Sequence, residues 1–240
     1  MSMADAVINV VGLSRSFGGR TVVRGVSLQL GPGELIGLVG ANGGGKTTTL
    51  RMLAGLLRPT SGSGSVLGGD VTRPGRAKRR QIGYVTQSLA LYPELTVTEN
   101  LRFRARALCG GDPKAQAAVV EEFGLSTVLH ARVSELSGGW ARRVQFAASV
   151  IHRPALLLLD EPTAGLDAKT RQDMWGWIAG LAAGGSTILV STHDLHEAER
   201  CPQIVHFCDG TAEGPLPPET FIRRSGAATL EAAIIAEASR

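Results

Sequence analysis

Short apolar runs recur along this chain and are separated by turn-forming residues. The first two runs, VINVVGL and VSLQL, fall within residues 7–38 and are divided by Gly18 and Gly19. Apolar runs bounded by glycine and proline are typical of strands. We therefore expect a pair of antiparallel strands that leads into the next apolar run, ELIGLV.

The pattern changes to a helical period after this run and then returns to strands. Leu50, Leu53 and Leu57 have the spacing of one helix face. The stretch RPTSGSGSVLGGD predicts a hairpin, and QIGYVT, PALLLLDEP, TILVS and IVHFC predict further strands. We expect IVHFC to be the last strand, and a short tail after residue 215 with one weakly amphipathic helix, LEAAIIAEA.

A helical block interrupts this alternation between Leu89 and His152. Thr96 and Glu99 form a capping-box pattern, and a Pro at residue 113 follows Asp112 as at the first turn of a helix. The chain as a whole predicts an α/β fold with a mostly parallel sheet, an N-terminal antiparallel β portion and an inserted α-helical subdomain.

The stretch GANGGGKTT carries the most specific chemistry in the sequence. It fits the pattern G-x-x-x-x-G-K-[ST] and stands between a predicted strand and a predicted helix. Glycines let backbone N–H groups converge on phosphate oxygens, while the helix N-terminus adds a positive dipole end. A glycine-rich turn could match by chance, but the flanking elements favour a nucleotide site. The residues assigned to it are Gly40, Asn42, Gly43, Gly45, Lys46, Thr47 and Thr48.

Two consecutive acids end the apolar strand LLLLDE. Carboxylates at the end of a buried strand are costly unless a cation lies beside them, and Mg²⁺ ligated by the Thr47 hydroxyl is the natural candidate. Asp160 would orient the ion through water, and Glu161 would act as general base for the attacking water. Capping of the next helix is the alternative role for these acids.

Polar residues also follow two other predicted strands. Gln87 comes after QIGYVT, where its amide could touch Mg²⁺ or the attacking water, although taken alone it would be a surface glutamine. His193 comes just past TILVS and could donate to a γ-phosphate. Phe17 lies at a turn, where it is either a packing residue or an aromatic ring that stacks on adenine.

A second small-residue helix start lies in LSGGWARRV. Ser137, Gly138 and Gly139 precede a helix that we expect to begin near Trp140, and such a start can bind a second anion. A serine N-cap followed by a flexible turn is the alternative.

Composition narrows the class of protein. The chain has 240 residues, a net charge of +4 and three cysteines. The modest charge does not indicate nucleic acid, and the scattered cysteines, read as buried thiols, form no disulfide framework or zinc site. With no signal-peptide pattern and no run of 18 apolar residues, we expect a cytosolic protein whose membrane work goes through a partner.

The order of these motifs resembles the nucleotide-binding domain of ABC transporters over nearly the whole chain. LSGG just before LLLLDEPTAGLD is the most specific part. The resemblance implies a single domain over 1–240, with a RecA-like core (1–88 and 153–214), a helical subdomain carrying the signature (89–152) and a short tail (215–240).

The resemblance also implies a role for each motif. Phe17 would stack on adenine, Gly40–Thr48 would be the Walker A loop, and Gln87 would be the Q-loop residue. Ser137, Gly138 and Gly139 would form the signature, Asp160 and Glu161 would close Walker B, Asp167 would belong to the D-loop, and His193 would be the switch histidine. The implied metal ligands are Thr47, Gln87 and Asp160, and the implied ligands of the protein are ATP and Mg²⁺.

In such proteins two ATPase domains pair head to tail, each signature closing over the other domain's ATP, and a separate integral-membrane subunit carries the substrate. We therefore expect a homodimer or heterodimer peripheral on the inner face of the cell membrane. The fifth signature residue, usually Gln, is Trp140 here. This Trp and the stretch SLALYPELTVTENL resemble exporters more than importers.

Two other functions stay open at this point. The chain could be a soluble ABC ATPase that acts on ribosomes or DNA, or one half of a tandem ABC protein. A degenerate domain that binds ATP without hydrolysing it is a further alternative, against which Glu161 and His193 argue.

Overall fold

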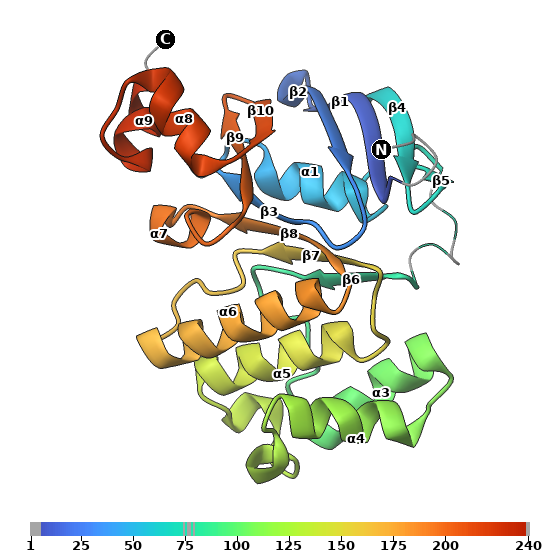
Figure 1. Cartoon of the computed structure of the whole chain (residues 1–240). Coiled ribbons are helices and arrows are strands. Elements are labelled where there is room, and N and C mark those ends of the chain that lie inside the picture. The colour runs from blue at the N-terminus through green and yellow to red at the C-terminus, as the bar shows by residue number, and fades with distance from the viewer. Residues whose placement is uncertain (1–5, 74, 76–77, 79, 239–240) are drawn as a thin grey trace.

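Two β-sheets organise residues 6–73, 75, 78 and 80–238, the part of the chain that the computed structural model describes (Figure 1). The smaller sheet is antiparallel and has the strand order β2-β1-β4-β5. Its strands are β1 (Ile8–Phe17), β2 (Arg20–Leu30), β4 (Ser61–Val66) and β5 (Gly69–Asp70).

The larger sheet has the order β10-β9-β3-β8-β7-β6 and is parallel except for β10, which runs antiparallel to β9. Its strands are β3 (Leu35–Val39), β6 (Ile82–Val85), β7 (Leu156–Asp160), β8 (Thr187–Thr192), β9 (Gln203–Cys208) and β10 (Thr211–Leu216). Strands covered on both faces are continuously apolar, as LLLL in β7 illustrates. Parallel order brings the carboxyl ends of β3, β8, β7 and β6 to one edge, where the site forms.

Helices cover both faces of the larger sheet. Helix α1 (Lys46–Leu53) lies between the two sheets, and a group of helices covers the opposite face (Figure 1). Helices α5 (Gly138–Val150) and α6 (Ala168–Ala183) lie next to the sheet, and α3 (Val97–Cys109) and α4 (Pro113–Glu122) pack beyond them against α5. The remaining helices are α7 (Leu195–Ala198), α8 (Pro218–Ser225) and α9 (Leu230–Ala238), with 3₁₀ turns at Ser126–Val128 and Val133–Glu135. Within the described residues, none of the helices has the length and apolar character needed to cross a bilayer.

The expected α/β fold is confirmed, and several local signals act as predicted. Thr96 and Glu99 make a reciprocal capping box at α3, and Asp112 caps α4 with a proline in the first turn. These interactions join neighbouring residues, so the sequence alone is enough to find them.

The prediction that IVHFC is the last strand, followed by one tail helix, was wrong. The structure adds β10 and α8 after it. Gly214 and Pro215 look like strand breakers, but β10 is an edge strand, where a missing N–H donor is tolerated. Pro218 starts α8 because the first turn of a helix needs no N–H donor.

Two smaller expectations also need correction. Helix α1 ends at Leu53, so Leu57 lies beyond it. Cys201 is buried as expected, but Cys109 and Cys208 are only partly buried. The residues at the two ends of the chain, 1–5 and 239–240, belong to the expected single domain but lie outside the described part.

Candidate functional site

The glycine-rich loop joins β3 to α1 in a conformation that needs glycine. Gly40 has φ of +139°, and a Cβ there would collide with the carbonyl of Phe207. Gly45, at the start of α1, has φ of +106°. L-residues with side chains are strained in this region, so these glycines permit a loop whose backbone N–H groups can face an anion.

Lys46 lies folded over this loop. Its ammonium donates to the carbonyls of Gly40 (2.6 Å) and Ala41 (3.0 Å), and the residue is 5% exposed. Burial lowers the pKa of Lys46, while the nearby carboxylates of Glu161 and Asp160 oppose that shift. A phosphate bound beside the loop would accept hydrogen bonds from the Lys46 ammonium in place of the two neutral carbonyls. Its negative charge would balance the positive charge of the ammonium.

Asp160 lies among hydroxyl groups at the carboxyl end of β7. Thr47 Oγ1 donates to its Oδ1 at 2.8 Å, and Ser191 Oγ donates to the same oxygen at 2.9 Å. Tyr84 Oη lies 3.4 Å from Oδ2. Burial, with a further contribution from Asp160, raises the pKa of Tyr84 to about 12, so the phenol stays a donor. Three hydroxyl groups thus surround the Asp160 carboxylate.

Glu161 takes the next position, and its backbone leaves the strand there. Its φ is +49°, which is uncommon for a residue with a side chain and stores strain. Its backbone N–H donates to Ser191 Oγ at 3.0 Å. On the side chain, Gln87 Nε2 donates to Oε2 at 3.1 Å, and His193 Nδ1 lies 3.3 Å from Oε1. One carboxylate thus contacts both polar residues that follow neighbouring strands.

The phosphate loop, Gln87 and Glu161 border one cavity of about 330 Å³. Its lining consists of Val22, Asn42, Gly43, Gly45, Lys46, Thr47, Thr48, Gln87 and Glu161. The structure therefore brings the predicted phosphate loop, the acids and Gln87 together, and His193 reaches the group through Glu161.

The predicted signature lies elsewhere on the same chain. Ser137, Gly139 and Asp167 line a second cavity of about 600 Å³, and none of them lines the first. Ser137 caps α5, and Asp167 caps α6 by accepting from the backbone N–H of Thr170 at 3.0 Å. Ser137 is thus an N-cap, as its alternative interpretation held, and the two capped helix starts border the same cavity.

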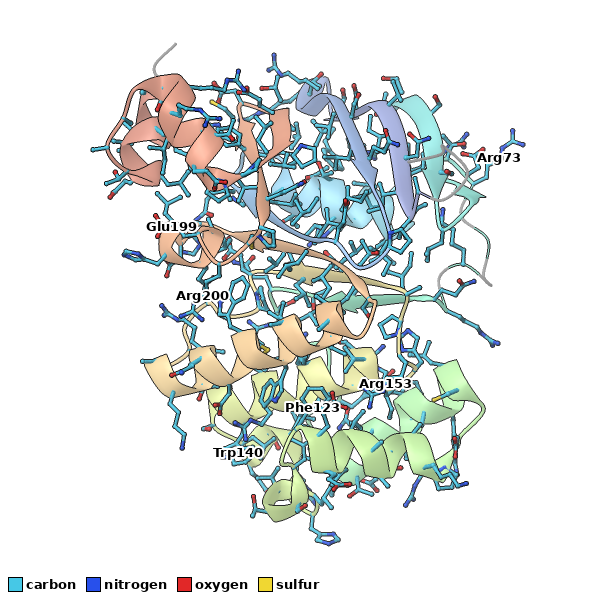
Figure 2. All side chains as sticks on the ribbon, viewed as in Figure 1. Arg73, Phe123, Trp140, Arg153, Glu199 and Arg200 are labelled. Carbon is cyan, nitrogen blue, oxygen red and sulfur yellow. The ribbon has the colours of Figure 1, made fainter. Side chains whose placement is uncertain are left out.

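Trp140, labelled in Figure 2, is fixed at the edge of this second cavity. The guanidinium of Arg143 lies 4.8 Å from the Trp140 ring centroid and 4.9 Å from that of Trp177. Arg143 also forms a 2.7 Å ion pair with Asp173 on α6. The indole is therefore held by a stack of cation and rings.

Phe17 is not a core residue. It is 45% exposed, and the Arg15 guanidinium lies 4.6 Å from its ring centroid. It is at the end of β1, opposite Arg20 on β2, and β2 contributes Val22 to the first cavity. Phe17 itself is not part of the lining of that cavity.

Sequence reasoning missed several residues that shape the site. Ser191 and Tyr84 hold Asp160, and Arg142 and Gln145 of α5 hold the backbone beside Gln87. Ser191 could have been found from its place at the end of a predicted strand. Arg142 carries only a weak signal, a charge on a helix otherwise rich in apolar residues.

The donor set fits Mg²⁺ that is shared with phosphate. Among the residues that the structure describes, no three His, Cys, Asp or Glu side chains gather as a metal-holding group. Thr47 donates its proton to Asp160, which leaves its oxygen lone pairs available. Mg²⁺ commonly combines few protein oxygens with substrate phosphates and water.

A glycine-rich loop between a buried strand and a helix, with an acid held against its threonine, defines a P-loop nucleotide-binding protein. A family model described as ABC transporter matches residues 23–164. The chain belongs to the ABC transporter family.

Named relatives share this region. The Nod factor export ATP-binding protein I of Paraburkholderia xenovorans is 42% identical over 201 residues, covering 82% of this chain and 66% of the relative. The probable multidrug ABC transporter ATP-binding protein YbhF of Escherichia coli is 39% identical over 204 residues, covering 83% of this chain. The chain spans only 35% of that longer relative.

Solved structures of ABC ATP-binding proteins are also similar to this chain. An ATP-binding subunit of an ABC transporter superposes with a TM-score of 0.88 at 29% identity, covering 98% of this chain and all of that chain. A dimeric ATP-binding cassette in a post-hydrolysis state with ADP and Pi has a TM-score of 0.79 at 26% identity, covering 88% of this chain and 98% of that chain.

Proposed function

We propose that this chain is the ATP-binding and ATP-hydrolysing subunit of an ABC transporter and that it drives export. The observation that carries the proposal is the linked set of contacts around one cavity: Lys46 over the loop, Thr47 on Asp160, and Gln87 and His193 on Glu161. These groups can bind a triphosphate and position a water beside its terminal phosphoryl group.

Phosphate binding would rest on the loop and Lys46. Backbone N–H groups of Gly43–Thr48 and the positive end of α1 would hold the phosphates, with Lys46 along the outer ones. Thr47, Asp160 and Gln87 would hold Mg²⁺, directly or through water. When bound, the ion neutralises charge on the outer phosphates. Phe17 would stack on the adenine, since its ring is exposed and the hairpin it belongs to contributes Val22 to the cavity.

Hydrolysis would rest on Glu161. Its carboxylate would accept the proton of the attacking water, while the amide of Gln87 orients that water. His193 would donate to the γ-phosphate and hold Glu161 in place. Because the amide and imidazole already meet on Glu161, a change at the γ-phosphate would be felt by all three groups.

The second cavity would receive the nucleotide of another copy or of a related domain. Ser137, Gly138 and Gly139, with Asp167 beside them, lie at a helix start whose N-terminal N–H groups could bind a phosphate. The dimeric neighbour supports this pairing. We propose residues 1–240 as one ATPase domain attached to an integral-membrane subunit at the inner face of the cell membrane. The exporter names of the relatives favour this over action on ribosomes or DNA.

Substitution of Glu161 by glutamine tests the proposal. It should lower ATP hydrolysis by about 100-fold or more, because the general base is lost, while ATP binding persists. Light scattering on this variant should show a monomer without nucleotide and a dimer with ATP and Mg²⁺. Wild-type chain with ADP is the control and should stay monomeric. Unchanged turnover in the variant would rule out the assigned role of Glu161.

A monomer that binds ATP without pairing would show that closure needs the membrane subunit, a different ATPase chain, or glutamine in place of Trp140. The Trp140→Gln variant separates the last of these from the first two.

A further inference from the structure

Two side chains of α5 hold the backbone that follows β6. Arg142 Nη1 donates to the carbonyl of Thr86 at 2.8 Å, and its Nη2 donates to the carbonyl of Gln87 at 2.6 Å. Arg142 is only 8% exposed although it carries a guanidinium. Burying a charged guanidinium costs free energy, so hydrogen bonds to the protein must replace those that it would make to water.

Gln145, one turn further along α5, holds the same backbone segment. We refer to Arg142 and Gln145 together as the anchor. Gln145 Oε1 accepts from Arg142 Nη1 at 2.9 Å, and the residue is 2% exposed. Its Nε2 donates to Thr86 Oγ1 at 3.1 Å and to the carbonyl of Ser88 at 3.0 Å. The pair thus satisfies three consecutive residues, 86–88, from a single helix face.

The geometry requires arginine in particular. A planar guanidinium presents Nη1 and Nη2 as a fork that matches two successive carbonyls, whereas a lysine ammonium engages them as one point charge. All the hydrogen-bond acceptors given above for Arg142 are neutral, and burial lowers its pKa. The guanidinium therefore fixes position here and neutralises no carboxylate among these contacts.

The anchor is connected to Glu161 through Gln87. The side chain of Gln87, whose carbonyl Arg142 holds, donates to Glu161 Oε2 at 3.1 Å. The same helix begins at Gly138, next to the Ser137 cap that borders the second cavity. One rigid element thus connects the second cavity to the carboxylate of the first.

We propose that Arg142 is a positioning residue that ties the backbone of Gln87 to α5. A movement of α5 would then change the contact between the Gln87 side-chain amide and Glu161. An anion bound at the start of α5 would then influence hydrolysis in the chain's own first cavity. This inference rests on the proposed function, but its structural part can be measured without catalysis.

Hydrogen exchange tests the structural part. The Arg142→Met variant should exchange the amides of residues 86–92 roughly tenfold faster than wild type, since local opening becomes easier. Arg153→Met is the matched control: Arg153, labelled in Figure 2, pairs with Glu122 on the surface at 2.6 Å. It should leave exchange at 86–92 unchanged. Equal exchange in wild type and Arg142→Met would overturn the anchor.

Kinetics test the coupling. Arg142→Met should lower kcat roughly 10- to 100-fold and change KM by less than about threefold. On a Gln87→Ala background the same substitution should have no further effect, because Arg142 acts through Gln87. Multiplicative losses would instead show a general structural role and overturn the proposal.

A lysine variant guards against misfolding. Arg142→Lys keeps the charge but can engage one carbonyl, so its kcat should lie between those of wild type and Arg142→Met. If the methionine variant does not fold, the lysine variant replaces it in the same cycle with the same criterion. If the wild-type chain hydrolyses no ATP, the proposed function fails and the exchange result alone decides the anchor.

Discussion

Asp160 and Glu161 show how one step along the backbone separates two carboxylates. Asp160 is the last residue of β7, where hydroxyls of Thr47 and Ser191 donate to it. Glu161 turns out of the strand with φ of +49° and meets an amide and an imidazole instead. The two neighbouring carboxylates therefore have different surroundings, hydroxyl groups around Asp160 and an amide and an imidazole beside Glu161.

Cys201 gives a prediction at the same scale. It is 2% exposed, and burial, with a smaller contribution from Glu197, raises the pKa of its thiol to about 12. At pH 8 only about 10⁻⁴ of the thiol would be thiolate, the reactive form. Native protein treated with iodoacetamide at pH 8 should therefore carry no label on Cys201 by mass spectrometry, whereas the partly exposed Cys109 and Cys208 are labelled.

Denatured protein is the control, in which all three cysteines should react. Labelling of Cys201 at the rate of Cys208 in native protein would contradict the burial of its thiol.

Side chains at three helix starts act as N-caps. Thr96, Ser137 and Asp167 each cap a helix by accepting from the backbone N–H three residues further along the chain. At α5 and α6 the caps also border the second cavity, whereas the cap of α3 does not. A substitution at the α3 cap therefore measures the contribution of a cap to the free energy of unfolding without changing the second cavity.

Replacing Thr96 by alanine should remove that cap. The hydroxyl accepts from the backbone N–H of Glu99 at 3.2 Å, and its loss costs about 1 kcal/mol of unfolding free energy. For a chain of this size the melting temperature should fall by about 2–4 °C, which calorimetry can measure. Thr96→Ser keeps the hydroxyl and should melt close to wild type. A serine variant as unstable as the alanine variant would show that the methyl group, and not the cap, matters.

The residues that we assign to ATP are divided between two cavities of the molecule. The first supplies Lys46, Thr47 and Glu161, and the second supplies Ser137 at a helix start, but one chain does not bring them to the same cavity. A nucleotide held by both must lie between two chains or domains.

Complementation between two inactive variants tests this arrangement. Ser137→Asp keeps a good N-cap but places a negative charge where a phosphate would bind, and Lys46→Ala weakens the first cavity. If the chain pairs with itself, each variant alone should be inactive. A mixture should regain activity, up to about a quarter of wild type for equal mixing, because the mixed dimer has one site with both defects and one intact site. Steady-state ATPase assays measure this.

Ser137→Asn is the matched control, since it keeps the cap and the size without the charge, and should retain most activity. A mixture that stays inactive, while both variants still dimerise, would contradict sites shared between chains.

The sequence by itself determined the features that depend on neighbouring residues. The glycines of the phosphate loop, the Thr96–Glu99 cap and the strand-end positions of Gln87, Asp160 and His193 follow from local backbone requirements. Each needs only a few consecutive residues, so a linear pattern is sufficient to predict it.

Only the tertiary structure decided which of these residues meet. Thr47 follows β3 and Asp160 ends β7, yet the two are hydrogen-bonded although β8 lies between those strands, and Ser191 of β8 donates to the same oxygen of Asp160. Contacts between residues distant in sequence decide the order of the strands and the edge position of β10. They also include the hydrogen bonds from Arg142 to the carbonyls of Thr86 and Gln87. Such contacts arise from the packing of whole elements, which local patterns do not encode.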